Sequence, residues 1–129
     1  MYINDSIEYP FKLDTEKIIG LAFEIHNNLG FGFLEVTYKE AFEYLFNFNG
    51  IEYVREKAYS VKYKQKTLPH KFYADFVVDN KIILEIKAKK SLPPEDIAQA
   101  INYLKCSGCK VGLILNFGTP KVEIKRVIL

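Results

Sequence analysis

Two acids and a lysine interrupt apolar segments in the middle of this 129-residue chain. Asp75 lies in the stretch 72–78, and Glu85 and Lys87 lie in the stretch 81–88. Neighbouring carboxylates repel each other unless a cation lies between them, and such oxygen ligands suit Mg²⁺ or Mn²⁺. A lysine beside them could stabilise a phosphate oxygen, which suits phosphodiester hydrolysis. An ordinary cross-strand ion pair, contributing up to about 1 kcal/mol, is the alternative that spacing alone leaves open.

The register between the two apolar strands decides whether these three side chains meet. The two apolar sets are Phe72, Ala74, Phe76 and Val78 on one strand and Ile82, Leu84 and Ile86 on the other. Burying both sets on one face requires even-numbered residues to pair with even-numbered ones, and this register brings Asp75, Glu85 and Lys87 together on the opposite face. A two-residue type I′ turn at Asp79-Asn80 would give the other register. We therefore predict a three-residue loop or a bulge there, with Asn80 in the left-handed position.

Further side chains are candidates for supporting roles. Glu35 falls in the first turn of a predicted helix, where the helix dipole favours an acid whatever its function. His26 lies on the apolar face of the preceding helix, a position more typical of a core histidine than of a ligand. Gln99 and Tyr103 lie four residues apart on one face of a later helix. They could contact a phosphate or orient Lys87, and solvated side chains are an equal alternative.

Apolar periodicity and turn residues predict the elements that position these side chains. Helices are expected at residues 14–29, 34–48 and 95–106, and strands at residues 52–56, 59–64, 71–78, 81–88, 111–117 and 122–128. A helix between strands indicates a right-handed crossover between parallel strands. We therefore expect an α/β fold with a mixed central β-sheet flanked by helices. No linker or repeat divides the chain, so one domain over residues 1–129 is expected.

Composition excludes several classes of protein. With 49% apolar and 26% charged residues, the chain is not of the disordered type. It has neither an apolar run of membrane-spanning length nor a signal peptide, so we expect a cytoplasmic protein with no membrane partner. Cys106 and Cys109 lack the four ligands of a structural zinc site, and reduced, partly buried thiols are expected, with a redox or metal role as the alternative.

The net charge of +2 is too small to indicate polyanion binding by itself. The charge is unevenly distributed, however. The segment 57–71 contains no acid, and its basic residues are Lys57, Lys62, Lys64, Lys66, His70 and Lys71. These side chains could follow a phosphate backbone, or they could solvate the edge of a hairpin and prevent edge-to-edge pairing.

Several separated motifs together resemble the bacterial and archaeal GxxExxY proteins, a family within the PD-(D/E)XK nuclease superfamily. The resemblance rests on residues 25–38, which include Gly32, Glu35 and Tyr38, on Ala74-Asp75, on Glu85-Ile86-Lys87, on Gln99 with residues 102–104, and on residues 111–113 and 116–118. The common family form has proline between two glycines where this chain has Phe31. That difference alters the loop and removes no polar group.

The resemblance implies a restriction-endonuclease-like fold and an active site at the matching positions. Asp75 and Glu85 would be the acidic metal ligands, the backbone carbonyl of Ile86 a further oxygen ligand, and Lys87 the catalytic lysine. Glu35 would be a further catalytic acid, the one that the superfamily often supplies from its first core helix. The supporting or nucleic-acid-binding positions would be Tyr38 on the second helix, His26 on the first helix, and Gln99 and Tyr103 on the helix after the catalytic strand.

The resulting hypothesis is a Mg²⁺- or Mn²⁺-dependent nuclease acting on DNA rather than RNA. A chain with only these helices and strands has little surface that could contact base edges. We therefore expect structure-selective or weakly specific cleavage, or targeting by a partner protein. A symmetric homodimer is compatible with this hypothesis, although no pattern locates an interface. The alternative is a non-cleaving module on the same fold that binds nucleic acid or protein, because a shared fold does not guarantee a shared activity.

Overall fold

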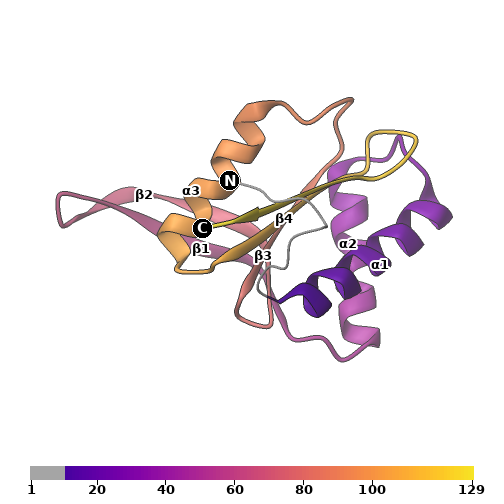
Figure 1. Cartoon of the computed structure of the whole chain (residues 1–129), viewed down its shortest axis with the longest axis horizontal. Coiled ribbons are helices and arrows are strands. Elements are labelled where there is room, and N and C mark those ends of the chain that lie inside the picture. Colours follow the sequence, from indigo (N-terminus) through magenta and orange to yellow (C-terminus); the bar gives the residue numbers. More distant parts are fainter. Residues whose placement is uncertain (1–10) are drawn as a thin grey trace.

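A mixed five-stranded β-sheet forms the centre of the computed structural model, which describes residues 11–129 (Figure 1). The strands, in order across the sheet, are β1 (Tyr53–Tyr63), β2 (Lys66–Val78), β3 (Ile82–Lys87), β4 (Val111–Asn116) and β5 (Glu123–Ile128). The helices are α1 (Lys12–Leu29), α2 (Glu35–Phe48) and α3 (Pro94–Ser107). β3 and β4 are parallel and joined through α3, whereas the other neighbouring strands are antiparallel. The predicted α/β fold with a mixed sheet is confirmed.

Helices cover both faces of the sheet. α1 and α2 pack on one face, against residues that include Leu84 and Leu113, and α3 packs on the other face, against residues that include Ile83 and Ile114. This double coverage explains why all six residues of β4 are buried and why its sequence is a continuous apolar run. None of the helices within residues 11–129 is long and apolar enough to cross a membrane.

The connection between α1 and α2 is held by a buried tyrosine. α1 ends at Gly30, whose φ of 68° is left-handed and whose N–H donates to the carbonyl of His26 at 2.8 Å. The hydroxyl of Tyr38 donates to the carbonyl of Gly30 at 2.7 Å and accepts from the N–H of Phe33 at 3.3 Å. The Tyr38 ring stacks on Phe117, with centroids 4.6 Å apart. Tyr38 therefore fixes how α2, with Glu35 in its first turn, approaches the sheet.

The loop between β2 and β3 has the length that the sequence predicted. Val78 pairs with Ile82, which leaves three residues in the loop. Asp79 and Asn80 both take left-handed conformations, with φ of 51° and 58°, and the N–H of Lys81 donates to the carbonyl of Val78 at 3.1 Å. The even-numbered register is therefore confirmed, and it directs Asp75 and Glu85 toward each other.

β1 and β2 change faces partway along their length, and the sequence did not predict this. The even-numbered apolar residues of β2 were expected on one face. Phe76 instead packs under α1 and α2, whereas the Phe72 ring stacks on Tyr103 of α3 with centroids 4.0 Å apart. The change occurs at Asp75 and at Glu56, which lies opposite and has a left-handed φ of 56°. The expectation was wrong because strict alternation assumes regular extended backbone throughout.

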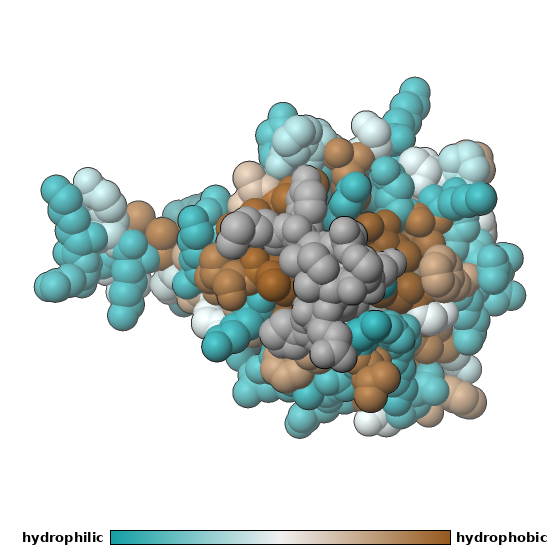
Figure 2. All heavy atoms as spheres, in the orientation of Figure 1, coloured by the Kyte–Doolittle hydropathy of each residue, from teal (hydrophilic) through white to brown (hydrophobic). Residues whose placement is uncertain are grey.

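Beyond this point β1 and β2 leave the sheet as a two-stranded arm, which we define as residues 57–74. β2 pairs with β3 only from Phe76 onward, whereas its pairing with β1 continues to Lys66. The arm projects from the body of the molecule on the left of Figure 1, and Figure 2 shows that its outer part is hydrophilic. Asp75 therefore lies at the root of the arm, where β2 separates from β3.

Candidate active site

Asp75 and Glu85 meet where the hydrogen-bond ladder between β2 and β3 ends. The N–H of Asp75 donates to Oε2 of Glu85 at 2.9 Å, and the N–H of Ile86 donates to Oδ2 of Asp75 at 2.7 Å. Both acids are buried, with exposures of 7% for Asp75 and 5% for Glu85. Each carboxylate therefore bonds to the backbone of the opposite strand, and these bonds fix the orientation of both side chains.

Two lysines approach the carboxylates from different elements. Nζ of Lys87, on β3, lies 3.9 Å from Oε1 of Glu85. Nζ of Lys39, on α2, lies 2.9 Å from Oδ1 of Asp75. The oxygens that face these amines are the ones that accept no backbone hydrogen bond from the opposite strand. The site thus contains two acids and two bases, and each acid has one oxygen directed toward a lysine.

Sequence reasoning missed Lys39. Its ammonium also lies 3.2 Å from Oε1 of Glu35 on α2 and 3.6 Å from Oε1 of Glu56 on β1. Lys39 therefore links both of these acids to Asp75. Burial alone would lower the pKa of Lys39, but hydrogen bonds and charge from Asp75 and Glu35 more than offset this and raise the pKa. The available signal was the four-residue spacing from Glu35, which places both side chains on one helix face.

The carboxylate of Glu85 is electrostatically destabilised. Burial, followed by the charge of Asp75, raises the pKa of Glu85 from 4.5 to about 8. The backbone N–H of Asp75 and the charges of Lys87 and Lys39 act in the opposite direction and only partly offset these effects. Near neutral pH the pair therefore needs another positive charge, either a proton or a cation.

Tyr103 lies close to the carboxylates, as its predicted place on the helix after β3 suggested. Burial, then the charges of Glu85 and Asp75, raise the pKa of its hydroxyl. Its ring is held by stacking on Phe72 at the base of the arm. Gln99, one turn earlier on α3, is exposed.

His26 and Tyr38 make their contacts away from the two carboxylates. Nε2 of His26 lies 2.9 Å from the carbonyl of Thr119, and its ring stacks on Phe117 with centroids 6.0 Å apart. Tyr38 bonds to the α1–α2 connection and stacks on the same phenylalanine. Within residues 11–129 the structure therefore brings neither side chain into contact with Asp75 or Glu85.

A buried asparagine fixes the chain that follows Lys87. Oδ1 of Asn116 accepts from the N–H of Lys89 at 2.9 Å, and its Nδ2 donates to the Lys89 carbonyl at 3.0 Å. Gly118 lies so close that a Cβ there would be 2.1 Å from the same carbonyl. An asparagine at the end of the otherwise apolar run of β4 was the sequence signal for this contact.

The oxygen ligands of the site fit a small divalent cation. Among residues 11–129, no cluster of three or more His, Cys, Asp or Glu could hold a metal ion. Mg²⁺, however, usually binds through one or two carboxylates and keeps several waters. Asp75 and Glu85 provide that pair, and the raised pKa of Glu85 reflects a site where a cation would relieve repulsion. The carboxylate pair therefore fits Mg²⁺ or Mn²⁺ and does not form a closed protein cage.

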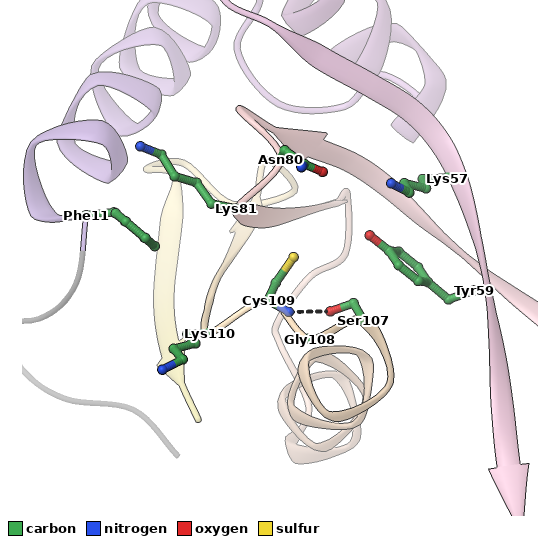
Figure 3. A pocket seen from close by; sticks show the side chains of 9 residues that line it. All are labelled: Phe11, Lys57, Tyr59, Asn80, Lys81, Ser107, Gly108, Cys109 and Lys110. Carbon is green, nitrogen blue, oxygen red and sulfur yellow. Dashed lines mark hydrogen bonds between the residues drawn. The ribbon is translucent and has the colours of Figure 1, made fainter.

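A separate cavity of about 400 Å³ lies at the opposite end of β3, where the strand begins (Figure 3). Its walls include Lys57, Tyr59, Asn80 and Cys109, and none of the lysines or acids of the carboxylate site. Cys109 is a free, half-buried thiol, and Cys106 is free but exposed, so the expected partial burial holds for Cys109 alone. Chemistry involving the carboxylates therefore has no direct connection to this cavity.

Comparison with known proteins identifies the family. The model of the PD-(D/E)XK nuclease superfamily matches residues 12–127, and the chain belongs to this superfamily. No curated protein matches the sequence. The crystal structure of SSO0001 superposes with a TM-score of 0.56 and 23% identity, covering 73% of this chain and 50% of the SSO0001 chain. At this identity the likeness supports the fold alone, and this chain matches about half the length of SSO0001.

Nucleases of this superfamily act on nucleic acid and typically use divalent metal ions. The family thus suggests nuclease activity, and the carboxylate pair is compatible with it. The sequence-based assignment to the superfamily and to its fold is confirmed.

Proposed function

We propose that this protein is a Mg²⁺- or Mn²⁺-dependent nuclease that hydrolyses phosphodiester bonds in DNA. The observation that carries the proposal is the pair of buried carboxylates, Asp75 and Glu85, each oriented by the backbone of the other's strand, with Lys87 beside them. A divalent cation bound there would polarise a phosphate oxygen and favour ionisation of an attacking water.

In this proposal Oδ1 of Asp75 and Oε1 of Glu85 hold the cation, because their partner oxygens already accept backbone hydrogen bonds. The N–H of Ile86 points toward Asp75, and in an extended strand the carbonyl of the same residue points to the same side. This supports the Ile86 carbonyl as a further oxygen ligand. Lys87 would stabilise the negative charge that develops on the phosphate oxygens.

The supporting residues act on the carboxylates in this proposal. Glu35 would hold Lys39 and thereby set the charge around Asp75, since its carboxylate lies 3.2 Å from the Lys39 ammonium. Tyr103 and Gln99 share the α3 face nearest the site, where they could orient a phosphate. We assign Tyr38 a positioning role through the α1–α2 connection, and His26 a role in holding α1 to the chain after β4.

The spacing Gly32, Glu35, Tyr38 supports placing this chain within the GxxExxY group, as we propose. Each of the three has a distinct role in the fold: Gly32 has a φ of 110°, Glu35 bonds to Lys39, and Tyr38 holds the connection before α2. We also propose that the chain acts as one nuclease domain, with cleavage selected by the structure of the substrate or by a targeting protein.

The test is cleavage of labelled duplex, single-stranded and branched DNA and RNA with magnesium or manganese. Wild type is compared with Asp75→Asn and Lys87→Met, and with Lys90→Met as a matched control on an exposed lysine three residues from Lys87. We expect cutting that requires metal, survives Lys90→Met, and disappears in the other two variants. Cutting that persists in Asp75→Asn would disprove the assignment of the site.

A non-cleaving binding module is the second candidate, and Lys39 favours it. Its ammonium contacts Asp75 at 2.9 Å, so an internal cation already neutralises one of the two acids. A module that only binds would not need to exchange this lysine for a metal. Titration with magnesium or manganese, followed by calorimetry, separates the two candidates: a nuclease binds the metal and loses binding in Asp75→Asn, whereas a binding module shows no metal binding in either.

A further inference from the structure

The arm carries a concentration of positive charge that the carboxylate site does not use. Four of its lysines are exposed: Lys62, Lys64, Lys66 and Lys71. No acid occurs between residues 57 and 71, and none of these four lysines forms an ion pair with any residue from 11 to 129. Nζ of Lys64 lies instead over the ring of Tyr63, 5.5 Å from its centroid. The arm therefore projects uncompensated positive charge into solvent.

These lysines point from both faces of the arm. The pairing of β1 with β2 shifts register by two residues between Ser60 and Lys62, where β2 carries the extra residues, and a shift of two leaves paired side chains on the same faces. Phe72 faces α3, which puts Lys66 on the same face and Lys71 on the opposite face. Lys62 is paired with Thr67 and therefore shares the face of Lys71. The ribbon thus presents cations on each side.

The tip of the arm has a strained turn. Lys64 and Gln65 form a two-residue turn between the paired residues Tyr63 and Lys66, and both are left-handed, with φ of 49° and 66°. Such turns favour Asn-Gly, and a larger residue in this conformation costs about 1 kcal/mol or more. Strain of this kind is typical of functional positions. The tip therefore has the cationic Lys64 at a position where the turn sequence Asn-Gly would make the fold more stable.

The root of the arm is the carboxylate site itself, because Asp75 is the residue at which β2 leaves β3. We propose that the arm enters the major groove of duplex DNA, with lysines on its two faces contacting the phosphates of both strands. This inference rests on the proposed function. The groove of B-form DNA is about 12 Å wide and admits a two-stranded β-ribbon, whereas the narrow major groove of A-form RNA does not.

The test is equilibrium binding of the full chain to labelled duplex DNA in chelator, followed by fluorescence anisotropy over a range of salt concentrations. The arm variant changes Lys62, Lys64, Lys66 and Lys71 to Gln. A control variant with the same change in charge replaces four exposed lysines outside the arm, namely Lys17, Lys105, Lys110 and Lys121, by Gln. Thermal denaturation establishes that both variants fold.

If each arm lysine contacts one phosphate, the slope of log K against log salt becomes shallower by about 3.6 in the arm variant. At physiological salt this corresponds to an affinity loss of up to about 1,000-fold, with the control close to wild type. Lys64→Asn with Gln65→Gly, which keeps the strands and relaxes the turn, should lower the slope by about 0.9. We also expect wild type to bind duplex DNA at least tenfold more tightly than duplex RNA, about 1.4 kcal/mol.

Equal slopes for wild type and the arm variant would overturn the inference, as would equal losses in the arm and control variants. Binding of duplex RNA as tight as that of duplex DNA would also overturn it, because the groove geometry would then be irrelevant. If DNA is cleaved while the arm variant binds it normally, only the arm inference fails. If wild type neither binds nor cleaves any nucleic acid, both the inference and the proposed function fail.

Discussion

Replacing Glu85 by Gln should stabilise the metal-free protein at alkaline pH. The carboxylate of Glu85 ionises with a pKa near 4.5 in an unfolded chain and about 8 in the fold. Between these values the folded state holds more protons than the unfolded state, so the free energy of unfolding falls as pH rises and levels off above about pH 8. Glutamine is isosteric and neutral, and its oxygen can still accept the N–H of Asp75.

The magnitude follows from the size of the shift. An elevation from 4.5 to about 8, at about 1.4 kcal/mol per pH unit, destabilises the ionised fold by up to about 5 kcal/mol. We expect Glu85→Gln to remove most of this penalty, so its free energy of unfolding changes far less than that of wild type between about pH 5 and about pH 9. Contributions that are common to both proteins cancel in the difference.

The assay is urea denaturation of both proteins in chelator across this pH range, followed by circular dichroism. A pH-dependent difference between wild type and Glu85→Gln below about 1 kcal/mol would refute the reasoning, since it would mean that Glu85 is ionised without penalty. Repeating the series with excess Mg²⁺ provides an internal check. A bound cation keeps both carboxylates ionised, so the stability of wild type should then lose most of its dependence on pH.

Three further variants test other parts of the structure. Tyr38→Phe removes the hydroxyl that bonds to the α1–α2 connection and should lower the free energy of unfolding by about 1–3 kcal/mol, measured by urea denaturation, with metal binding unchanged. Gly118→Ala puts a methyl group 2.1 Å from the Lys89 carbonyl and should lower the melting temperature more than any exposed Gly→Ala change; a normal melting temperature would contradict the close approach. Lys64→Asn with Gln65→Gly should raise the free energy of unfolding by about 1–2 kcal/mol, and no gain would show that the turn is unstrained.

Local patterns predicted most of the fold. The helices, the three-residue loop after β2 and the crossover through α3 follow from periodicity and turn chemistry, which depend on neighbouring residues. The change of faces at Asp75 does not, because periodicity assumes regular extended backbone and does not indicate that Glu56 takes a left-handed conformation. Two predicted strands, 52–56 and 59–64, are likewise one continuous strand, β1.

The site was predicted unevenly for a similar reason. Asp75, Glu85 and Lys87 lie on adjacent strands, so register alone brings them together. Lys39 comes from a helix on one side of the sheet, and only the packing of α2 brings its ammonium to Asp75. The four-residue spacing explains why Lys39 lies beside Glu35, but it contains no information about the contact between Lys39 and Asp75.

The hydrogen bonds of Asp75 and Glu85 affect how related sequences should be compared. Each acid accepts a backbone N–H where the pairing of β2 with β3 ends, so a relative that does not cut nucleic acid would still need a hydrogen-bond acceptor at both positions. Selection for folding alone would therefore retain an acid or its amide at positions 75 and 85. Within residues 11–129, the side chain of Lys87 forms a single long ion pair, 3.9 Å from Glu85, and Lys87 contributes to the sheet through its backbone, which other residues could provide. Whether a relative retains Lys87 is therefore a better indicator of the proposed nuclease activity than whether it retains the two acids.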